Sequence, residues 1–204
     1  MKRLPPVLFF SIYACSFLVG AVLMGFEMLG SRYLFPYFGG GIGTWASLIS
    51  TVLCALAIGY FAGSAIVARH PSHRAIAVAI LIAAAYLACV PATADPAMQA
   101  ILDTLGDGAS ATLLASTALL LVPLTLLGTF SPIAVSLLTG SANEAGRVAG
   151  LVYGVSTIGN VVGTLFTTFF LIPTIGSRAI TYYFALVLAA CAVVLFLNPV
   201  KRST

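Results

Sequence analysis

The chain has 204 residues, of which 61% are apolar and only 7% are charged, and its formal net charge is +4. Soluble domains carry about 25% charged residues, so this composition excludes a water-soluble globular protein. The basic residues lie between apolar runs, where membrane topology explains them, and they indicate no nucleic-acid partner. The lipid bilayer is the first partner that the composition predicts.

Six apolar runs follow one another along the chain, and each is long enough to cross a bilayer as a helix. They cover residues 7–29, 42–68, 75–94, 112–138, 150–172 and 179–197. Backbone polar groups inside a bilayer must be satisfied within each segment, which makes each run helical. The sequence therefore predicts an all-α polytopic membrane protein, with six transmembrane helices in a single membrane domain over residues 1–204.

The first run carries Glu27, the one carboxylate inside the six runs. We interpret this run as an uncleaved helix, because no Ala-x-Ala type of cleavage site follows it. A carboxylate at membrane depth is costly and needs a partner, and Arg32 is the nearest candidate if the chain turns at Gly30. Two interpretations stay open for Glu27: a structural ion pair near the outer interface, or a proton- or substrate-coupled role.

A glycine-rich segment, residues 39–43, leads into the second run, and its glycines permit a sharp turn. Trp45 follows and is expected to anchor the helix at the membrane interface. Further along the run, Gly59 and Gly63 form the small-xxx-small spacing that lets two helices approach closely. Helix packing is therefore the expected role of these two glycines.

The connection between the third and fourth runs, residues 95–111, mixes apolar and acidic residues. This pattern predicts a short helix on the outer membrane surface. The fourth run contains Pro123 and Pro132, which have no backbone N–H to donate. We therefore expect a kink or a break near residues 128–132.

The fifth run places small and polar residues on one helical face. They are Ser156, Gly159, Asn160, Gly163, Thr164 and Thr167. Close packing through Gly159 and Gly163 is one interpretation of this face, and a polar cavity lined by Asn160 and Ser156 is the other. Together with the glycines of the second run, the face suggests two inverted three-helix repeats, the plan of many secondary transporters.

Basic residues favour one set of connecting segments. This set holds Lys2, Arg3, Arg69, Arg74, Arg147, Lys201 and Arg202, whereas the other loops hold Arg32 and Arg178. Loops that stay in the cytoplasm are rich in lysine and arginine. Both termini are therefore predicted to face the cytoplasm, with the protein in the inner membrane of the cell.

Residues suited to catalysis or metal binding are scarce. The two histidines, His70 and His73, have no third ligand near them in sequence, which makes a poor metal site. A hydrolytic triad is unsupported for the same reason, and the cysteines lie inside apolar runs as small packing residues. The sequence predicts no catalytic residue, no metal and no cofactor.

Two segments carry motifs of short, glycine-rich character. The first comprises residues 27–32, Leu34, Pro36, Trp45 and residues 59–63, and the second residues 147–150, Tyr153, Gly159, Gly163 and residues 171–173. Together they resemble the membrane portion of the bacterial fused major-facilitator/spermidine synthase family. The resemblance implies half of a major-facilitator-like fold. No synthase pattern follows in this chain, so polyamine synthesis is not expected of it.

Two functions follow from these patterns. The first is a transporter unit that moves a small organic solute, polyamine-like if the resemblance holds, as a dimer of six-helix halves. Glu27, Arg32, Asn160 and Ser156 are then the candidate substrate or coupling residues. The alternative is a non-catalytic membrane anchor or assembly subunit, in which the basic loops at Arg69, Arg74 and Arg147 dock a partner enzyme.

Overall fold

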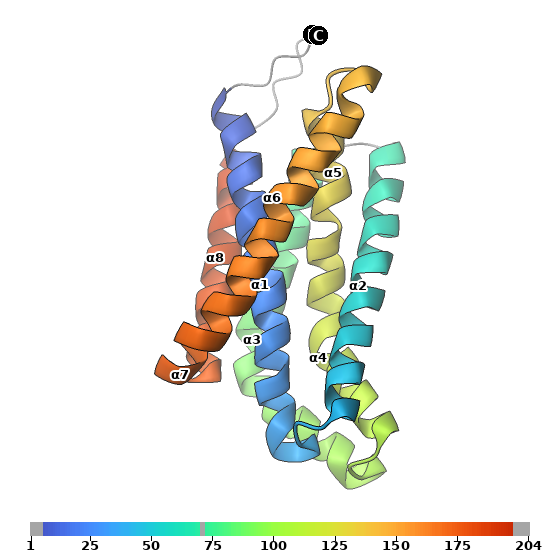
Figure 1. Ribbon diagram of the computed structural model, residues 1–204, viewed down its shortest axis with the longest axis vertical. Coiled ribbons are helices and arrows are strands. Elements are labelled where there is room, and N and C mark those ends of the chain that lie inside the picture. The colour runs from blue at the N-terminus through green and yellow to red at the C-terminus, as the bar shows by residue number, and fades with distance from the viewer. Residues whose placement is uncertain (1–5, 70–71, 198–204) are drawn as a thin grey trace.

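The computed structural model describes residues 6–69 and 72–197, and within these residues the secondary structure is entirely helical. The elements are α1 (Pro6–Phe38), α2 (Ile42–Arg69), α3 (His73–Leu105), α4 (Ala109–Gly128), α5 (Phe130–Leu138), η1 (Ala142–Glu144), α6 (Ala145–Phe166), η2 (Thr167–Leu171), α7 (Ile172–Thr174) and α8 (Ser177–Leu197). Figure 1 shows a bundle of long helices that run roughly along one axis.

The prediction of an all-α protein with six membrane-spanning helices is confirmed for the described part of the chain. Six helical segments have the length and apolarity needed to cross a membrane. The fourth segment combines α4 with α5, and the fifth extends from η1 through α6 and η2 to α7. The protein is therefore a multi-pass integral membrane protein in contact with lipid.

α1 is longer than predicted and does not turn at Gly30. It continues as one helix to Phe38, and the chain turns at Gly39, whose φ is 69°. Gly30 instead lets α1 pack closely against α2, because a Cβ there would lie 3.1 Å from the Leu48 side chain. The expectation of a turn at Gly30 is wrong, since its missing side chain makes room for a neighbouring helix.

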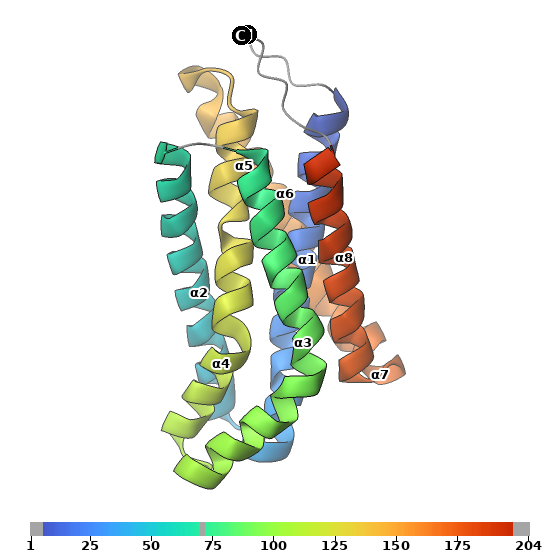
Figure 2. The same cartoon turned by 180° about the vertical axis from the view of Figure 1, so that it is seen from behind.

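α3 also extends beyond its predicted end. Residues 95–105 are helical, as expected for the connection over residues 95–111, but they continue α3, which runs without interruption from His73 to Leu105 with Pro91 and Pro96 inside it, and do not form a separate helix. Gly106 ends the helix at a φ of 70°, and its N–H donates to the Leu102 carbonyl at 2.8 Å. Figure 2 shows the last turns of α3 bending across the end of the bundle.

The expected break in the fourth membrane segment is confirmed. α4 ends at Gly128 and α5 begins at Phe130, with Thr129 between them. Pro132 has no N–H to donate to the Gly128 carbonyl four residues earlier, which removes a hydrogen bond of the helix at this point. The Thr129 hydroxyl instead donates to the Leu126 carbonyl at 2.7 Å.

The helices form three principal pairs: α1 with α6, α2 with α4, and α3 with α8. Figures 1 and 2 show α2 and α6 on one side of the bundle and α3 and α8 on the other. The large side chains that are fully buried between the pairs include Phe26, Phe130, Leu48, Ile80 and Leu120. α2 and α6 are the least buried of the six spans.

The two ends of the bundle differ in charge. Arg69, Arg74 and Arg147 are exposed at the end where α1 begins, here named the basic end. At the opposite end, Arg178 of α8 donates a hydrogen bond to Asp95 of α3 in an exposed ion pair. Lys2, Arg3, His70, Lys201 and Arg202 lie outside the described residues, and the orientation of the bundle in the membrane stays a prediction.

Candidate functional site

The crossing of α1 and α6 brings two backbones into contact. A Cβ added at Gly159 would lie 2.1 Å from the Phe17 carbonyl oxygen, and one at Gly163 would lie 2.1 Å from the Ala21 carbonyl oxygen. From the other side, a Cβ at Gly20 would lie 2.4 Å from the Ser156 carbonyl oxygen. Only glycine permits so close an approach of the two helices.

The crossing of α2 with α4 and α5 is built in the same way. A Cβ added at Gly59 would lie 2.5 Å from the Thr125 carbonyl oxygen, and one at Gly63 would lie 2.9 Å from the Thr129 carbonyl oxygen. A Cβ at Gly128 would lie 3.5 Å from the Cα of Leu56. Four of the glycines singled out in the sequence, Gly59, Gly63, Gly159 and Gly163, therefore hold the two crossings together.

The two crossings correspond residue by residue. Adding 108 to a residue number on α1, and subtracting 100 from one on α6, converts three contacts of the first crossing into three contacts of the second. The pairs Phe17–Gly159, Ala21–Gly163 and Gly20–Ser156 become Thr125–Gly59, Thr129–Gly63 and Gly128–Leu56. We refer to this renumbering as the repeat operation.

The repeat operation also exchanges whole helices: α1 with α4, α2 with α6, and α3 with α8. It turns α1 with α6 into α4 with α2, turns α1 with α8 into α4 with α3, and returns α3 with α8 to itself; all of these pairs are in contact. Because each unit has three spans, the second unit enters the bundle from the opposite end. This arrangement is an inverted repeat, with a pseudo-two-fold axis in the plane of the membrane.

Glu27 lies on α1 beyond the crossing, toward the end opposite the basic end. Glu27 is only 7% exposed. Within residues 6–69 and 72–197, its side chain makes no hydrogen bond or ion pair. Arg32 is exposed and does not pair with it. The expected ion pair is wrong because α1 stays helical, and residues five apart lie on different faces of a helix.

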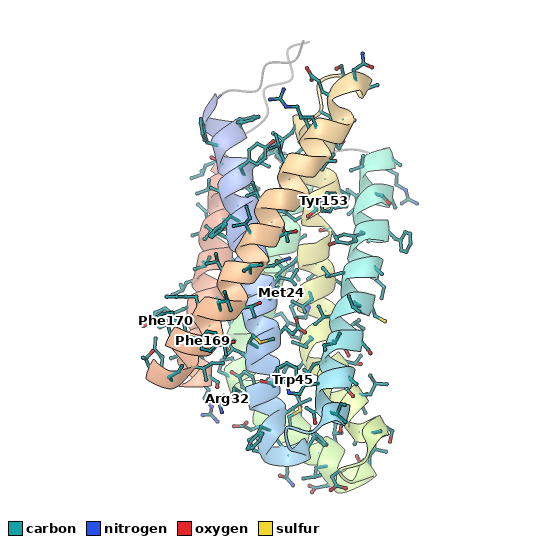
Figure 3. All side chains as sticks on the ribbon, viewed as in Figure 1. Met24, Arg32, Trp45, Tyr153, Phe169 and Phe170 are labelled. Carbon is teal, nitrogen blue, oxygen red and sulfur yellow. The ribbon has the colours of Figure 1, made fainter. Side chains whose placement is uncertain are left out.

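The direction of Glu27 follows from its neighbours on α1. Gly20, two turns earlier, faces α6, and Gly30, one turn later, faces Leu48 of α2 and Leu120 of α4. Glu27 therefore lies on the side of α1 between these two contacts, which faces the space between α6 and α2. Figure 3 shows Met24, one turn before Glu27, on this side of the bundle, with Trp45 on α2 nearby.

Asn160 and Ser156 lie at the α1–α6 crossing itself. The Asn160 Oδ1 atom would be 2.8 Å from a Cβ at Gly20, and it is buried without a hydrogen-bond donor among the described residues. Gly20 and Glu27 are about 10 Å apart along α1 at 1.5 Å per residue. The structure therefore places Asn160 and Glu27 on one side of α1 but at different depths, and does not bring them together.

Sequence reasoning missed Ser16 and the π-helical turn η2. Ser16 is fully buried, and its hydroxyl donates to the Val152 carbonyl of α6 at 3.1 Å; its position four residues before Gly20 was the available signal. In η2, Thr167 contacts α1 at Gly25, and the Thr168 hydroxyl is buried without a partner in the described structure. Single π turns are frequent at functional sites.

A cavity of about 340 Å³ lies between α2, α5 and α6 toward the basic end. It is lined by Ser64, Val67, Pro132, Val135, Ser136 and Tyr153. Figure 3 shows Tyr153 facing the space between α6 and α2, where its ring meets that of Tyr60 edge to face at 6.1 Å. The lining combines apolar walls with three hydroxyl groups, as small-molecule sites commonly do.

The remaining candidate residues lie at the two ends of the bundle. Trp45 is 37% exposed in the first turn of α2, and the three arginines of the basic end are exposed. Within the part of the chain that the structure describes, no group of three or more histidine, cysteine, aspartate or glutamate residues is placed to hold a metal ion.

Comparison of the chain with protein-family models, with curated proteins and with solved structures finds no match. The site consists of the buried carboxyl of Glu27 on α1 and the amide and hydroxyl groups of Asn160 and Ser156 on α6. The cavity between α2, α5 and α6 lies near the second crossing.

Proposed function

We propose that the protein is a six-helix transporter unit that moves a small organic solute across the membrane and works as a dimer. The observation that carries this proposal is the residue-by-residue correspondence of the two glycine crossings. Inverted repeats of this kind let a membrane protein take up two related conformations, each open to one side. An anchor needs no such symmetry.

The buried carboxyl of Glu27 supports the same function. Burying a carboxyl group without a hydrogen-bond partner costs free energy, so a residue with a purely structural role would be paired. Glu27 has no partner among the described residues and lies on the side of α1 between its contacts with α6 and with α2. In the proposed transporter it contacts the solute or carries the coupling proton, and Asn160 and Ser156 supply hydrogen bonds at mid-membrane depth.

The dimer follows from the exposure of α2 and α6. Only 28% of an apolar stretch of α2 and 17% of one in the fifth span, which contains α6, are buried inside one copy. A second copy packed against these two helices would enclose a pathway between two halves. The motif resemblance to the fused major-facilitator/spermidine synthase family leads to the same proposal, and it adds polyamine-like solutes to the candidates.

The proposal is tested by reconstituting the purified protein into liposomes with an imposed pH gradient. Addition of small amines, with putrescine and benzylamine as the first two, should accelerate dissipation of the gradient, measured with a pH-sensitive dye. Glu27→Gln should abolish the acceleration. Glu144→Gln, which removes a carboxyl that is exposed at the basic end, should leave it unchanged. Equal losses in both variants, or no response to any solute, would contradict the proposal.

The alternative function, an assembly subunit, is favoured by one observation. Gly146, Gly150 and Gly154 recur at every fourth position of α6, and added Cβ atoms there would meet no atom within 4 Å. Such a face accepts a partner helix at short range. Native mass spectrometry from nanodiscs separates the two functions, because a homodimer supports the transporter and a stable complex with a different subunit supports the anchor.

A further inference from the structure

The repeat operation assigns a counterpart to every residue that lines the cavity. Pro132, Val135 and Ser136 of α5 correspond to Met24, Glu27 and Met28 of α1. Ser64 and Val67 of α2 correspond to Thr164 and Thr167, and Tyr153 of α6 corresponds to Leu53. The buried carboxyl therefore occupies the position that Val135 occupies in the cavity, a relation that neither residue reveals alone.

The two equivalent regions differ in accessibility and in chemistry. The region around Val135 is open as a cavity, whereas Glu27 is only 7% exposed. The cavity contains no charged side chain, whereas its counterpart holds one carboxyl, the Thr164 hydroxyl and two thioethers. Leu53 is 61% exposed and lies at the edge of this region, and Thr167 faces Gly25, on the other side of α1 from Glu27. The backbone of the two units also differs here, because the π-helical turn η2 begins at Thr167, whereas its counterpart Val67 lies within the regular α-helix α2.

We propose that Met24, Glu27, Met28 and Thr164 form a second, closed binding site, with the exposed Leu53 at its outer edge, that opens at the end opposite the basic end and binds a singly charged organic cation. This inference rests on the proposed transport function and specifies its substrate class. The protein then has two conformations, related by the repeat operation. In one the cavity is open and the Glu27 site is closed, and in the other the two repeats have exchanged conformations, so that the cavity is closed and the Glu27 site is open.

The ligand class follows from the charge and shape of the lining. One carboxylate neutralises one positive charge, and a second charge would stay uncompensated in an apolar environment. Thioether and leucine side chains offer soft, adaptable contacts to a hydrocarbon or aromatic body, and the Thr164 hydroxyl accepts a hydrogen bond from an ammonium group. A primary amine attached to an apolar group satisfies all three conditions.

Cysteine accessibility tests the closed site in intact protein. In a background with the exposed Cys54 and Cys89 replaced by alanine, Ser136→Cys reports on the cavity and Met28→Cys on its counterpart. Membrane vesicles of both orientations are treated with a membrane-impermeant cationic methanethiosulfonate. Ser136→Cys should react from the side of the basic end, and Met28→Cys only from the opposite side. Thr174→Cys, exposed near that side, shows that the reagent reaches it.

The two sites should also exclude each other. Modification of Ser136→Cys with a bulky maleimide should lower the reaction rate of Met28→Cys in the double variant by about tenfold, because it holds the bundle in one of its two states. Reaction of Met28→Cys from the basic side, or no reaction from either side while Thr174→Cys reacts, would overturn the proposal.

Protection by a ligand tests the charge preference. Benzylammonium should protect Met28→Cys from modification, and benzoate, which has a similar ring and the opposite charge, should not. Adding Glu27→Gln should remove the protection. Equal protection by both compounds, or protection that survives Glu27→Gln, would refute the cation site.

These results separate the inference from the transport function on which it rests. Amine-dependent flux in liposomes with an unreactive Met28→Cys would leave the transporter standing and refute the closed site. Alternating reactivity of Met28→Cys and Ser136→Cys without flux of any solute would support the closed site and refute transport.

Discussion

The α1–α6 crossing and the crossing of α2 with α4 and α5 share one backbone design and differ in the chemistry placed beside it. Both use glycines to bring two parallel helices into contact at equivalent positions. The first has an amide and a buried carboxyl beside it, on an unbroken α1. The second has a break at Thr129 and an uncharged cavity.

This difference separates what the fold requires from what function requires. The glycine contacts occur in both repeats, so they belong to the architecture. The carboxyl of Glu27 occurs in one repeat only and has valine as its counterpart, so the fold has no need of it. We conclude that the crossings supply the framework and that the asymmetry between the repeats marks the functional residues.

The largest expected effect comes from breaking the tighter crossing. Gly163→Leu should destabilise the protein by about 3 kcal/mol, because the new side chain begins 2.1 Å from the Ala21 carbonyl oxygen and a helix backbone cannot give way cheaply. Thermal unfolding in detergent, followed by size-exclusion chromatography of heated samples, measures the loss. Gly154→Leu on the same helix is the control, since a Cβ there meets open space; equal losses would contradict the crossing.

A smaller loss is expected at the equivalent crossing. Gly59→Ala should cost about 1–2 kcal/mol and less than Gly163→Ala, because the nearest atom to the new Cβ lies at 2.5 Å rather than 2.1 Å. The same thermal assay ranks the two variants. A reversed order would show that the two crossings are not equally rigid frameworks.

Glu27→Gln should act in the opposite direction. Removing an unpaired buried carboxyl should raise stability by about 1 kcal/mol, since the neutral amide is less costly to bury than a charge, while Glu144→Gln should change nothing measurable. A loss of stability in Glu27→Gln would indicate a structural role for the carboxyl and would erase the functional distinction between the repeats.

The smallest effect is expected at the exposed ion pair between the third helices of the two units. Asp95→Asn removes the partner of Arg178, but exposed pairs contribute little and are screened by salt. The shift in melting temperature should be the smallest of the series and should vanish in 1 M salt. A large shift that persists in salt would show that this pair fastens the two units together.

Apolar run length and backbone chemistry were readable from the sequence. Six runs predicted six spans, and the missing N–H of Pro132 predicted the break at Thr129. By contrast, α3 accommodates Pro91 and Pro96 without a break. A proline always removes a donor, but only tertiary contacts decide whether the helix also ends.

The candidate site was only partly readable. Glu27 stood out because it is the one carboxylate in an apolar run, yet its partner was predicted wrongly, since Arg32 lies on another face of a helix that was expected to end earlier. The cavity residues Ser64 and Ser136 gave no signal, because their relation to Glu27 exists only through the repeat operation. Sequence spacing reports faces of single helices, whereas the site is formed between helices.

The inverted repeat is tested most directly by disulfide cross-linking at a contact that only the repeat operation predicts. Ser16 contacts Val152 across the first crossing, so the operation predicts that Leu124 and Val52 are adjacent across the second. With Cys54 and Cys89 replaced by alanine, Ser16→Cys with Val152→Cys and Leu124→Cys with Val52→Cys should both cross-link in membranes, and no single variant should. Cross-linking of the first pair alone would contradict the inverted repeat.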